Sequence, residues 1–122
     1  QEYAGQPWFL NQIVELTLDD GIWTPETLLL ALLDLERKLG RVRSPCPDLR
    51  YGPRAIDIDL LLFGEEQRRT SFCTLPHPRM TQRAFVLLPL RDVAPALRIE
   101  GGTAAQHLER LRWRCEGQRI FQ

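Results

Sequence analysis

Asp57 and Asp59 are the residues of this 122-residue chain whose types and spacing most directly suggest chemistry. They begin an apolar run, and side chains two residues apart in a strand share a face, with Cα atoms roughly 6–7 Å apart. Such a pair suits Mg²⁺, which takes one or two carboxylates together with phosphate oxygens. Arg54, just upstream in a Gly-Pro turn, could reach the same phosphates with its planar guanidinium. The pattern also fits a half-buried strand with two solvated aspartates.

Basic side chains gather around this motif although the whole chain is neutral, with sixteen Lys and Arg against sixteen Asp and Glu. The net charge therefore argues neither for nor against a nucleic-acid partner. Local basic clusters on a neutral protein favour a small anionic ligand over a long polyanion, and scattered solubilising arginines are the alternative. The clusters are Arg37, Lys38, Arg41, Arg43, Arg50 and Arg54, and a second group of Arg68, Arg69, Arg79 and Arg83.

The elements that would position these residues are strands and helices without regular β-α alternation, which indicates an α+β fold. The clearest helix is predicted to begin at Pro25, with Thr24 as N-cap, to carry a stripe of leucines at helical spacing and to end before Gly40, the C′ residue. Strands are predicted at 9–18 and 55–63, within 69–74 and at 119–122, and further helices at 78–83, 85–93 and 103–112. A long Pro-rich loop over 41–53 is typical of a functional segment.

Length and cysteine usage narrow the class of protein. A chain of 122 residues fits one domain. Cys46, Cys73 and Cys115 form neither a disulfide framework nor a zinc motif, which favours a cytoplasmic protein with reduced thiols. The apolar runs are too short to cross a membrane, and no signal peptide is visible. Because the first residue is Gln1, we expect that a segment upstream has been removed or left out.

Four linked motifs make the chain resemble the 6-hydroxymethyl-7,8-dihydropterin pyrophosphokinases of the folate pathway. They occur in the family's order and roughly its spacing, cover nearly the whole chain and are least clear beyond about Leu97. The motifs are Gln6-Pro7-Trp8-Phe9-Leu10-Asn11; Glu36 with Leu39-Gly40-Arg41-Val42-Arg43; Gly52-Pro53-Arg54 with Asp57-Ile58-Asp59-Leu60; and Leu75-Pro76-His77-Pro78-Arg79-Met80 with Arg83-Ala84-Phe85.

The resemblance implies an ATP-dependent enzyme that transfers pyrophosphate to the hydroxymethyl group of the pterin and releases AMP, using two Mg²⁺ ions. It assigns Asp57 and Asp59 as ligands of the metal ions. The catalytic residues that it implies are these two aspartates together with Arg43 and Arg54. It assigns ATP to Arg41, Arg43, Arg54, His77 and Arg83, and the pterin to Phe9, Asn11, Tyr51 and Phe85. Taken alone, the arginines fit surface charge, the phenylalanines fit core packing, and Glu36 fits an exposed partner for nearby arginines.

The chain also departs from the family pattern. Tyr51 occupies a loop position usually filled by tryptophan, and the loop over 44–50 is longer than in many relatives. The resemblance implies a ferredoxin-like antiparallel sheet with helices packed on it, but the family's first strand, helix and second strand are missing from this sequence. We therefore predict one domain over 1–122 that is incomplete at its N-terminus, with exposed sheet surface. The chain is expected to be a piece of a longer protein or to self-associate.

Two alternatives to the pyrophosphokinase remain open from sequence. A nucleotide-sugar transferase would use the Asp57 and Asp59 pair but would explain neither the pterin-pocket residues nor the arginine loop. A catalytically inactive nucleotide-binding or assembly module is compatible with the missing start. The expected partners are small molecules, ATP and the pterin, rather than nucleic acid or a membrane.

Overall fold

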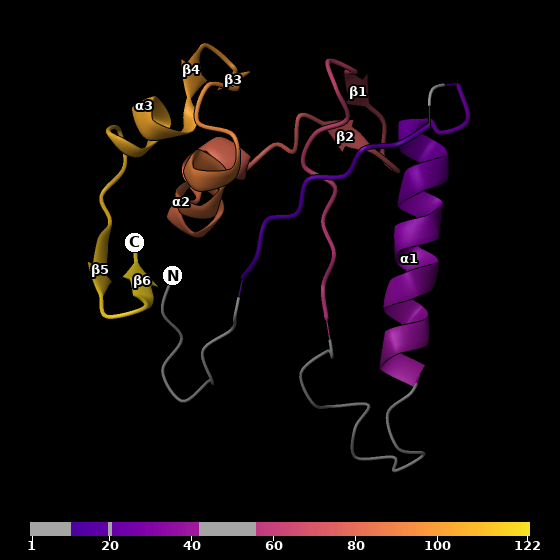
Figure 1. The fold of residues 1–122 in the computed structure, drawn as a ribbon, viewed down its shortest axis with the longest axis horizontal. Coiled ribbons are helices and arrows are strands. Elements are labelled where there is room, and N and C mark those ends of the chain that lie inside the picture. Colours follow the sequence, from indigo (N-terminus) through magenta and orange to yellow (C-terminus); the bar gives the residue numbers. More distant parts are fainter. Residues whose placement is uncertain (1–10, 20, 42–55) are drawn as a thin grey trace. The chain divides into compact units, whose positions relative to one another are not determined.

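The structure, a computed structural model, describes residues 11–19, 21–41 and 56–122. The chain divides into two compact units, one of Leu18–His77 and one of Gln1–Thr17 with Pro78–Gln122 (Figure 1). The described elements comprise helices and short antiparallel strand pairs, which confirms the α+β class. These strands form three separate two-stranded sheets rather than one larger sheet. Among the helices of the described ranges, none is long and apolar enough to span a membrane.

The unit Leu18–His77 is built around helix α1 (Pro25–Arg41), which confirms the clearest sequence prediction. The helix begins at a reciprocal cap, in which the Thr27 amide donates to Thr24 Oγ1 at 3.1 Å and the Thr24 amide donates to Thr27 Oγ1 at 2.9 Å. The cap satisfies amides that the first turn of a helix otherwise leaves without a partner. The helix is longer than predicted, because it continues through Gly40, the expected C′ residue, and ends at Arg41.

A hairpin follows in the same unit, where one weak strand was predicted within 69–74. Strand β1 (Arg68–Arg69) pairs antiparallel with β2 (Thr74–Leu75). Thr70 closes the turn, because its hydroxyl donates to the Cys73 carbonyl and accepts from the Cys73 amide, both at 2.9 Å. The prediction of a single strand is wrong because Thr70 and Cys73 reverse the chain in the middle of that segment.

Two segments predicted as strands have no strand partner in the described part of the chain. Residues 11–19 and 56–63 carry no strand assignment. A strand is defined by its ladder to a neighbour, and the apolar pattern that predicted these two does not supply one. The described parts of both predicted strands are therefore non-helical segments without a ladder.

The unit with Pro78–Gln122 has a closed apolar core. The 3-10 helix η2 (Met80–Gln82) leads into α2 (Ala84–Val93), and α2 packs on α3 (Ala104–Leu108). Helix α2 confirms the prediction for 85–93. Helix α3 is shorter than the predicted 103–112, and it begins at a capping box formed by Thr103 and Gln106. The buried side chains include Met80, Ala84, Leu87, Leu90, Ile99, Ala104 and Leu108.

Two hairpins complete this unit, and three of their four strands were not predicted. Strands β3 (Arg98–Ile99) and β4 (Gly102–Thr103) are joined by Glu100 and Gly101, both at positive φ, which is the geometry of a tight hairpin turn. Strands β5 (Arg114–Glu116) and β6 (Arg119–Phe121) pair antiparallel, and β6 corresponds to the predicted final strand.

Candidate functional site

The acidic pair lies on the segment that follows the undescribed residues 42–55. Asp57 and Asp59 are exposed, whereas Ile58 and Leu60 are half-buried. This alternation gives the two carboxylates access to solvent, which is compatible both with a metal site and with the alternative of two solvated aspartates. Within the described ranges no group of three or more His, Cys, Asp or Glu side chains is arranged to hold a metal. Two carboxylates nevertheless fit Mg²⁺ bound together with phosphate, because that ion usually takes few protein ligands and keeps water or phosphate oxygens for the rest.

Glu36 on α1 holds the backbone between these two aspartates. The Ile58 amide donates to Glu36 Oε2 at 2.7 Å. Ile58 is the residue between Asp57 and Asp59, so this bond fixes the peptide that joins Asp57 to it. A hydrogen bond to a charged acceptor is stronger than one between neutral groups.

The sequence interpretation of Glu36 as an exposed side chain needs correction. Glu36 is half-buried and accepts a backbone hydrogen bond from a residue 22 positions away. A signal was present in the sequence, because Glu36 lies on the leucine stripe of the helix, four residues after Leu32 and three before Leu39. A carboxylate on an apolar stripe requires a buried partner, and here the partner is the Ile58 amide.

The segment of the acidic pair is also tied to the segment of His77. The His77 amide donates to the Leu61 carbonyl at 2.9 Å, and the His77 side chain is half-buried. Asp57, Asp59 and His77 therefore belong to one unit, on two stretches of chain that are joined by a backbone hydrogen bond.

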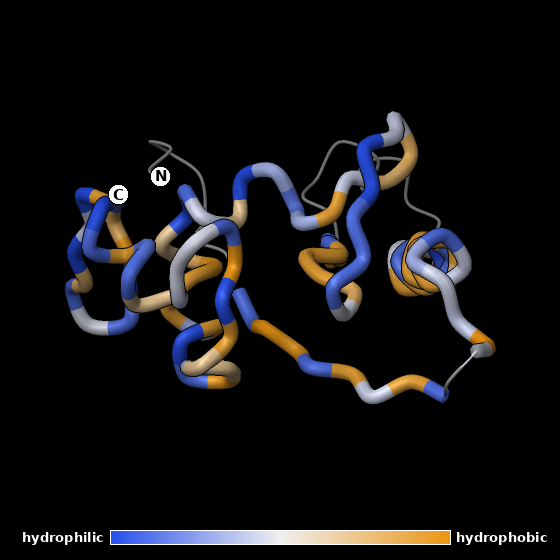
Figure 2. The backbone as a smooth tube through the Cα atoms, turned by 90° about the horizontal axis from the view of Figure 1, so that it is seen from above, coloured by the Kyte–Doolittle hydropathy of each residue, from blue (hydrophilic) through white to orange (hydrophobic). Residues whose placement is uncertain are grey.

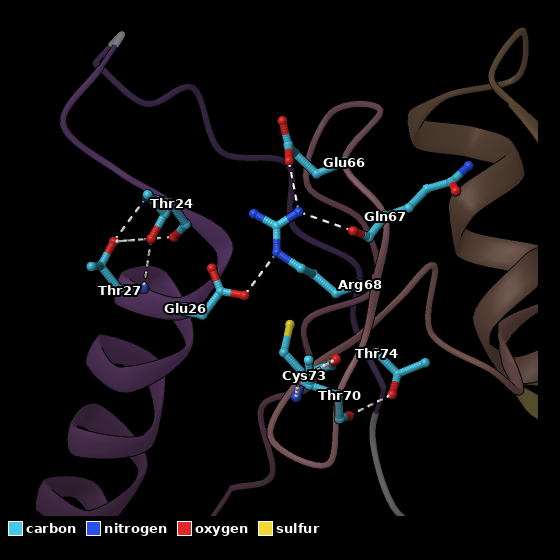
Figure 3. A network of polar contacts seen from close by, with 9 residues as sticks. All are labelled: Thr24, Glu26, Thr27, Glu66, Gln67, Arg68, Thr70, Cys73 and Thr74. Carbon is cyan, nitrogen blue, oxygen red and sulfur yellow. Dashed lines mark hydrogen bonds and ion pairs between the residues drawn. The ribbon is translucent and has the colours of Figure 1, made fainter.

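Arg68 links the hairpin to the start of α1 (Figure 3). Its Nε donates to Glu26 Oε2 and its Nη1 donates to Glu66 Oε1, both at 2.8 Å. The hydrogen bond from Arg68 lowers the pKa of Glu26, and the bonds to Glu66 and Glu26 raise the pKa of Arg68. Arg68 belonged to the second basic cluster, and these contacts give it a structural role.

Arg83 and Phe85 lie at the start of α2 in the other unit. Arg83 is the N-cap residue, with φ −121° and ψ 110°. Its guanidinium carbon lies 5.6 Å from the centroid of the Phe85 ring, which is within cation–π range. Both side chains are half-buried, so each keeps part of its surface available to a ligand. The residue predicted to bind ATP and one predicted to bind the pterin are thus in direct contact.

The remaining predicted site residues are placed only in part. Asn11 is exposed and belongs to the unit of Arg83 and Phe85. Arg41 is the last residue of α1. The other predicted residues lie outside the described part of the chain; they are Phe9, Arg43, Tyr51 and Arg54.

Two exposed carboxylates on one segment can bind a divalent cation together with phosphate oxygens. The comparison with known families is more specific. The profile of the 7,8-dihydro-6-hydroxymethylpterin-pyrophosphokinase family matches residues 1–95, and the chain belongs to this family. The described residues from Ala96 to Gln122, which form β3, β4, α3, β5 and β6, follow the matched region.

Individual relatives agree with the family match. Over 112 residues the chain is 45% identical to the 2-amino-4-hydroxy-6-hydroxymethyldihydropteridine pyrophosphokinase of Pseudomonas aeruginosa, covering 92% of this chain and 63% of that protein. It is 37% identical over 110 residues to the protein of the same name from Bacillus subtilis, covering 90% of this chain and 62% of that protein. The folate synthesis bifunctional protein of Pisum sativum is 41% identical over 88 residues, which cover 72% of this chain and 16% of that protein. The chain spans just under two thirds of the length of these bacterial relatives.

Proposed function

We propose that this chain catalyses the reaction for which its bacterial relatives are named. The pyrophosphoryl group of ATP would pass to the hydroxymethyl group of 6-hydroxymethyl-7,8-dihydropterin, with release of AMP, as a step of folate biosynthesis. Family membership supports the class of reaction. The observation that supports the site is the acidic pair Asp57 and Asp59, exposed to solvent on a segment that Glu36 holds through the Ile58 amide.

The proposed step is a substitution at the β-phosphorus of ATP. The hydroxyl oxygen of the pterin forms a bond to this phosphorus and loses its proton to solvent, while the bond from the phosphorus to the oxygen bridging it to the α-phosphate breaks and AMP leaves. Bound Mg²⁺ would neutralise phosphate charge, and Asp57 and Asp59 are proposed to hold two such ions. The work of the protein is then mainly to place the two substrates and stabilise charge.

The remaining site residues are proposed in the roles that the family resemblance implies. Arg41, Arg43 and Arg54 would bind phosphate oxygens, and His77 and Arg83 would also contact ATP. Phe9, Asn11, Tyr51 and Phe85 would bind the pterin, because aromatic rings stack on a flat heterocycle and an amide can donate to and accept from its edge. The position of Arg83 over the Phe85 ring supports a shared binding surface for the two substrates at this point.

We also propose that the family's ferredoxin-like sheet is the framework of the complete fold. In addition, we propose that two copies of the chain associate through the face of α1 that carries Leu30 and Leu33. Leu30 is 57% exposed and Leu33 is 43% exposed on that helix, which is more apolar surface than a solvated helix face usually carries. Leu30→Lys would place a charge in such an interface. Sedimentation should then show a monomer for the variant and a dimer for the wild type, and identical sedimentation would rule this interface out.

A cytoplasmic location remains a proposal based on the cysteine usage.

The activity is tested by incubating the chain with ATP, Mg²⁺ and 6-hydroxymethyl-7,8-dihydropterin and separating the nucleotide products. AMP formed in step with the pyrophosphorylated pterin is the expected result. ADP as the product would contradict pyrophosphoryl transfer. A folded chain that binds ATP without forming AMP would instead indicate the inactive nucleotide-binding module.

A further inference from the structure

The Gln122 side chain holds the backbone on both sides of Arg83. Gln122 Oε1 accepts a hydrogen bond from the Ala84 amide at 2.7 Å, and Gln122 Nε2 donates to the Gln82 carbonyl. Gln82 and Ala84 are the residues immediately before and after Arg83. A single amide group 38 positions further along the chain therefore fixes the two peptides that flank Arg83.

This contact supplies what the start of α2 lacks. The first amides of a helix have no partner within the helix, and the N-cap residue commonly provides one through its side chain. Arg83 is the N-cap residue here, and its side chain makes no capping hydrogen bond. The oxygen of Gln122 accepts from the first amide of the helix, which the Arg83 side chain could not do because a guanidinium has no acceptor. The Arg83 guanidinium lies over the Phe85 ring instead.

The hairpin that carries Gln122 is itself held in place. Strand β6 pairs with β5, and β6 contacts α2. The Arg114 guanidinium carbon lies 4.1 Å from the centroid of the Phe121 ring, and Arg114 Nε donates to Glu116 Oε2 at 2.7 Å. Gln122 follows directly after Phe121, so the pairing of the hairpin restricts the position of the Gln122 side-chain amide at the start of α2.

We propose that Gln122 is a positioning residue that sets the orientation of Arg83 and Phe85 toward their ligands. The ligand part of this inference rests on the proposed function, in which Arg83 contacts ATP and Phe85 contacts the pterin. The residue lies beyond the part of the chain that matches the family profile, although it acts on residues within that part. The hairpin β5–β6 is thereby a support for the substrate-binding end of α2.

The test compares Gln122→Ala with Gln118→Ala, which alters another exposed glutamine of the same hairpin. NMR spectra of the full chain without ligand follow exchange of the Ala84 amide and the resonances of the Arg83 side chain, which the Phe85 ring current shifts. Loss of the cap should speed Ala84 exchange about five- to tenfold, the equivalent of one hydrogen bond, and move the Arg83 signals. Gln118→Ala should change neither.

A second variant separates the two hydrogen bonds of Gln122. Gln122→Glu keeps an acceptor for the Ala84 amide and loses the donor to the Gln82 carbonyl. It should preserve slow exchange at Ala84. If Gln122→Ala fails to fold, Gln122→Met keeps the length of the side chain without either polar group and should speed Ala84 exchange by the same factor; exchange as slow as in the wild type would overturn the capping role. In the activity assay, Gln122→Ala should raise KM for ATP by a similar factor with a smaller change in kcat, since a positioning residue acts through ligand contacts.

The outcomes distinguish this inference from the proposed function. If Ala84 exchange and the Arg83 resonances are the same in Gln122→Ala and the wild type, Gln122 does not position these residues, whatever the activity. If the wild type forms no AMP, the proposed function fails, and the positioning role is still decided by the ligand-free spectra. Altered spectra with unchanged KM for ATP would overturn the role of Gln122 in ligand binding.

Discussion

The two units of this chain hold their candidate site residues in different ways. In the unit of Pro78–Gln122, Met80, Ala84 and Leu87 are completely buried, and the start of α2 lies on that core. In the unit of Leu18–His77, α1 carries both apolar and polar residues (Figure 2), and Leu30 is 57% exposed and Leu33 43% exposed. This unit buries Leu28, Cys73 and Leu75, so both units have buried residues, but more large apolar side chains stay accessible on the unit of α1.

This difference indicates what each candidate residue depends on. Arg83 and Phe85 depend on packing beneath α2 and on the Gln122 cap. The acidic pair depends on a few polar contacts, chiefly the hydrogen bond from the Ile58 amide to Glu36. Mutations should therefore act through loss of packing in one unit and through loss of single hydrogen bonds in the other.

The largest effect is expected from removal of either carboxylate of the acidic pair. Asp57→Ala and Asp59→Ala should each lower the rate of AMP formation by about 10³-fold, because each removes a group proposed to hold the metal and thus much of the charge stabilisation. Both residues are exposed, so the urea midpoint should barely move. Asp92→Ala, at an exposed aspartate of α2, is the matched control. A variant of Asp57 or Asp59 with full activity would show the metal assignment to be wrong.

The second prediction tests the contrast in packing directly. Leu87 is fully buried, whereas Ile22 is 66% exposed. Leu87→Ala should lower the free energy of unfolding by about 2–5 kcal/mol through lost burial and a cavity. Ile22→Ala should change it by less than about 0.5 kcal/mol, because little surface is buried there. Urea titrations of both variants measure the difference, and equal losses would mean that Ile22 is packed as tightly as Leu87.

The third prediction concerns the hydrogen bond that supports the acidic pair. Glu36→Ala leaves the Ile58 amide without its acceptor, and an unsatisfied amide costs about 1–3 kcal/mol. Exchange of the Ile58 amide should become about tenfold faster, and kcat/KM for AMP formation should fall about tenfold. Asp34→Ala on the same helix removes only exposed ion pairs with Arg37 and Lys38 and should alter neither quantity. If the two variants behave alike, Glu36 does not hold the acidic pair in place.

Much of this fold could be predicted from the sequence wherever the signal is local. Thr24 and Pro25 mark the start of α1, and the leucine spacing carries it to its end. Helix α2 was recognised from the spacing of its apolar residues despite Pro89. The alternation of acidic and apolar residues over 57–60 matches the observed exposure, because Asp57 and Asp59 are exposed whereas Ile58 and Leu60 are half-buried.

The rest depended on contacts between distant positions. The bonds that Glu36 and Gln122 make span 22 and 38 positions, and no local pattern reports such a partner. The predicted strand at 55–63 lacks a ladder over its described residues, because strand formation depends on a neighbour and not only on alternation. Short hairpins such as β3–β4 escape prediction because two residues per strand carry almost no periodicity.

The smallest expected effect concerns the ion pair between Glu26 and Arg68. The hydrogen bond from Arg68 lowers the pKa of the Glu26 carboxyl in the folded chain. In the unfolded chain a glutamate has a pKa of about 4.3. Because the pKa of Glu26 is lower in the folded chain, the ion pair stabilises the folded state when the pH is above the unfolded pKa. This contribution is lost as the pH falls through the folded pKa. Asp34 also has a lowered pKa, through Lys38 and Arg37, so its contribution to stability is also lost in acid, and the wild type alone cannot isolate Glu26.

Glu26→Gln isolates it: the urea midpoint of the variant should lie below that of the wild type near neutral pH, and the gap should narrow as the pH falls below the unfolded pKa of Glu26 and through the lowered folded one, because the wild-type carboxylate then protonates. Glu65→Gln, at an exposed glutamate before the hairpin, is the control for removal of one carboxylate. A gap for Glu26→Gln that stays constant or widens in acid would mean that Arg68 holds α1 to the hairpin without help from the Glu26 charge.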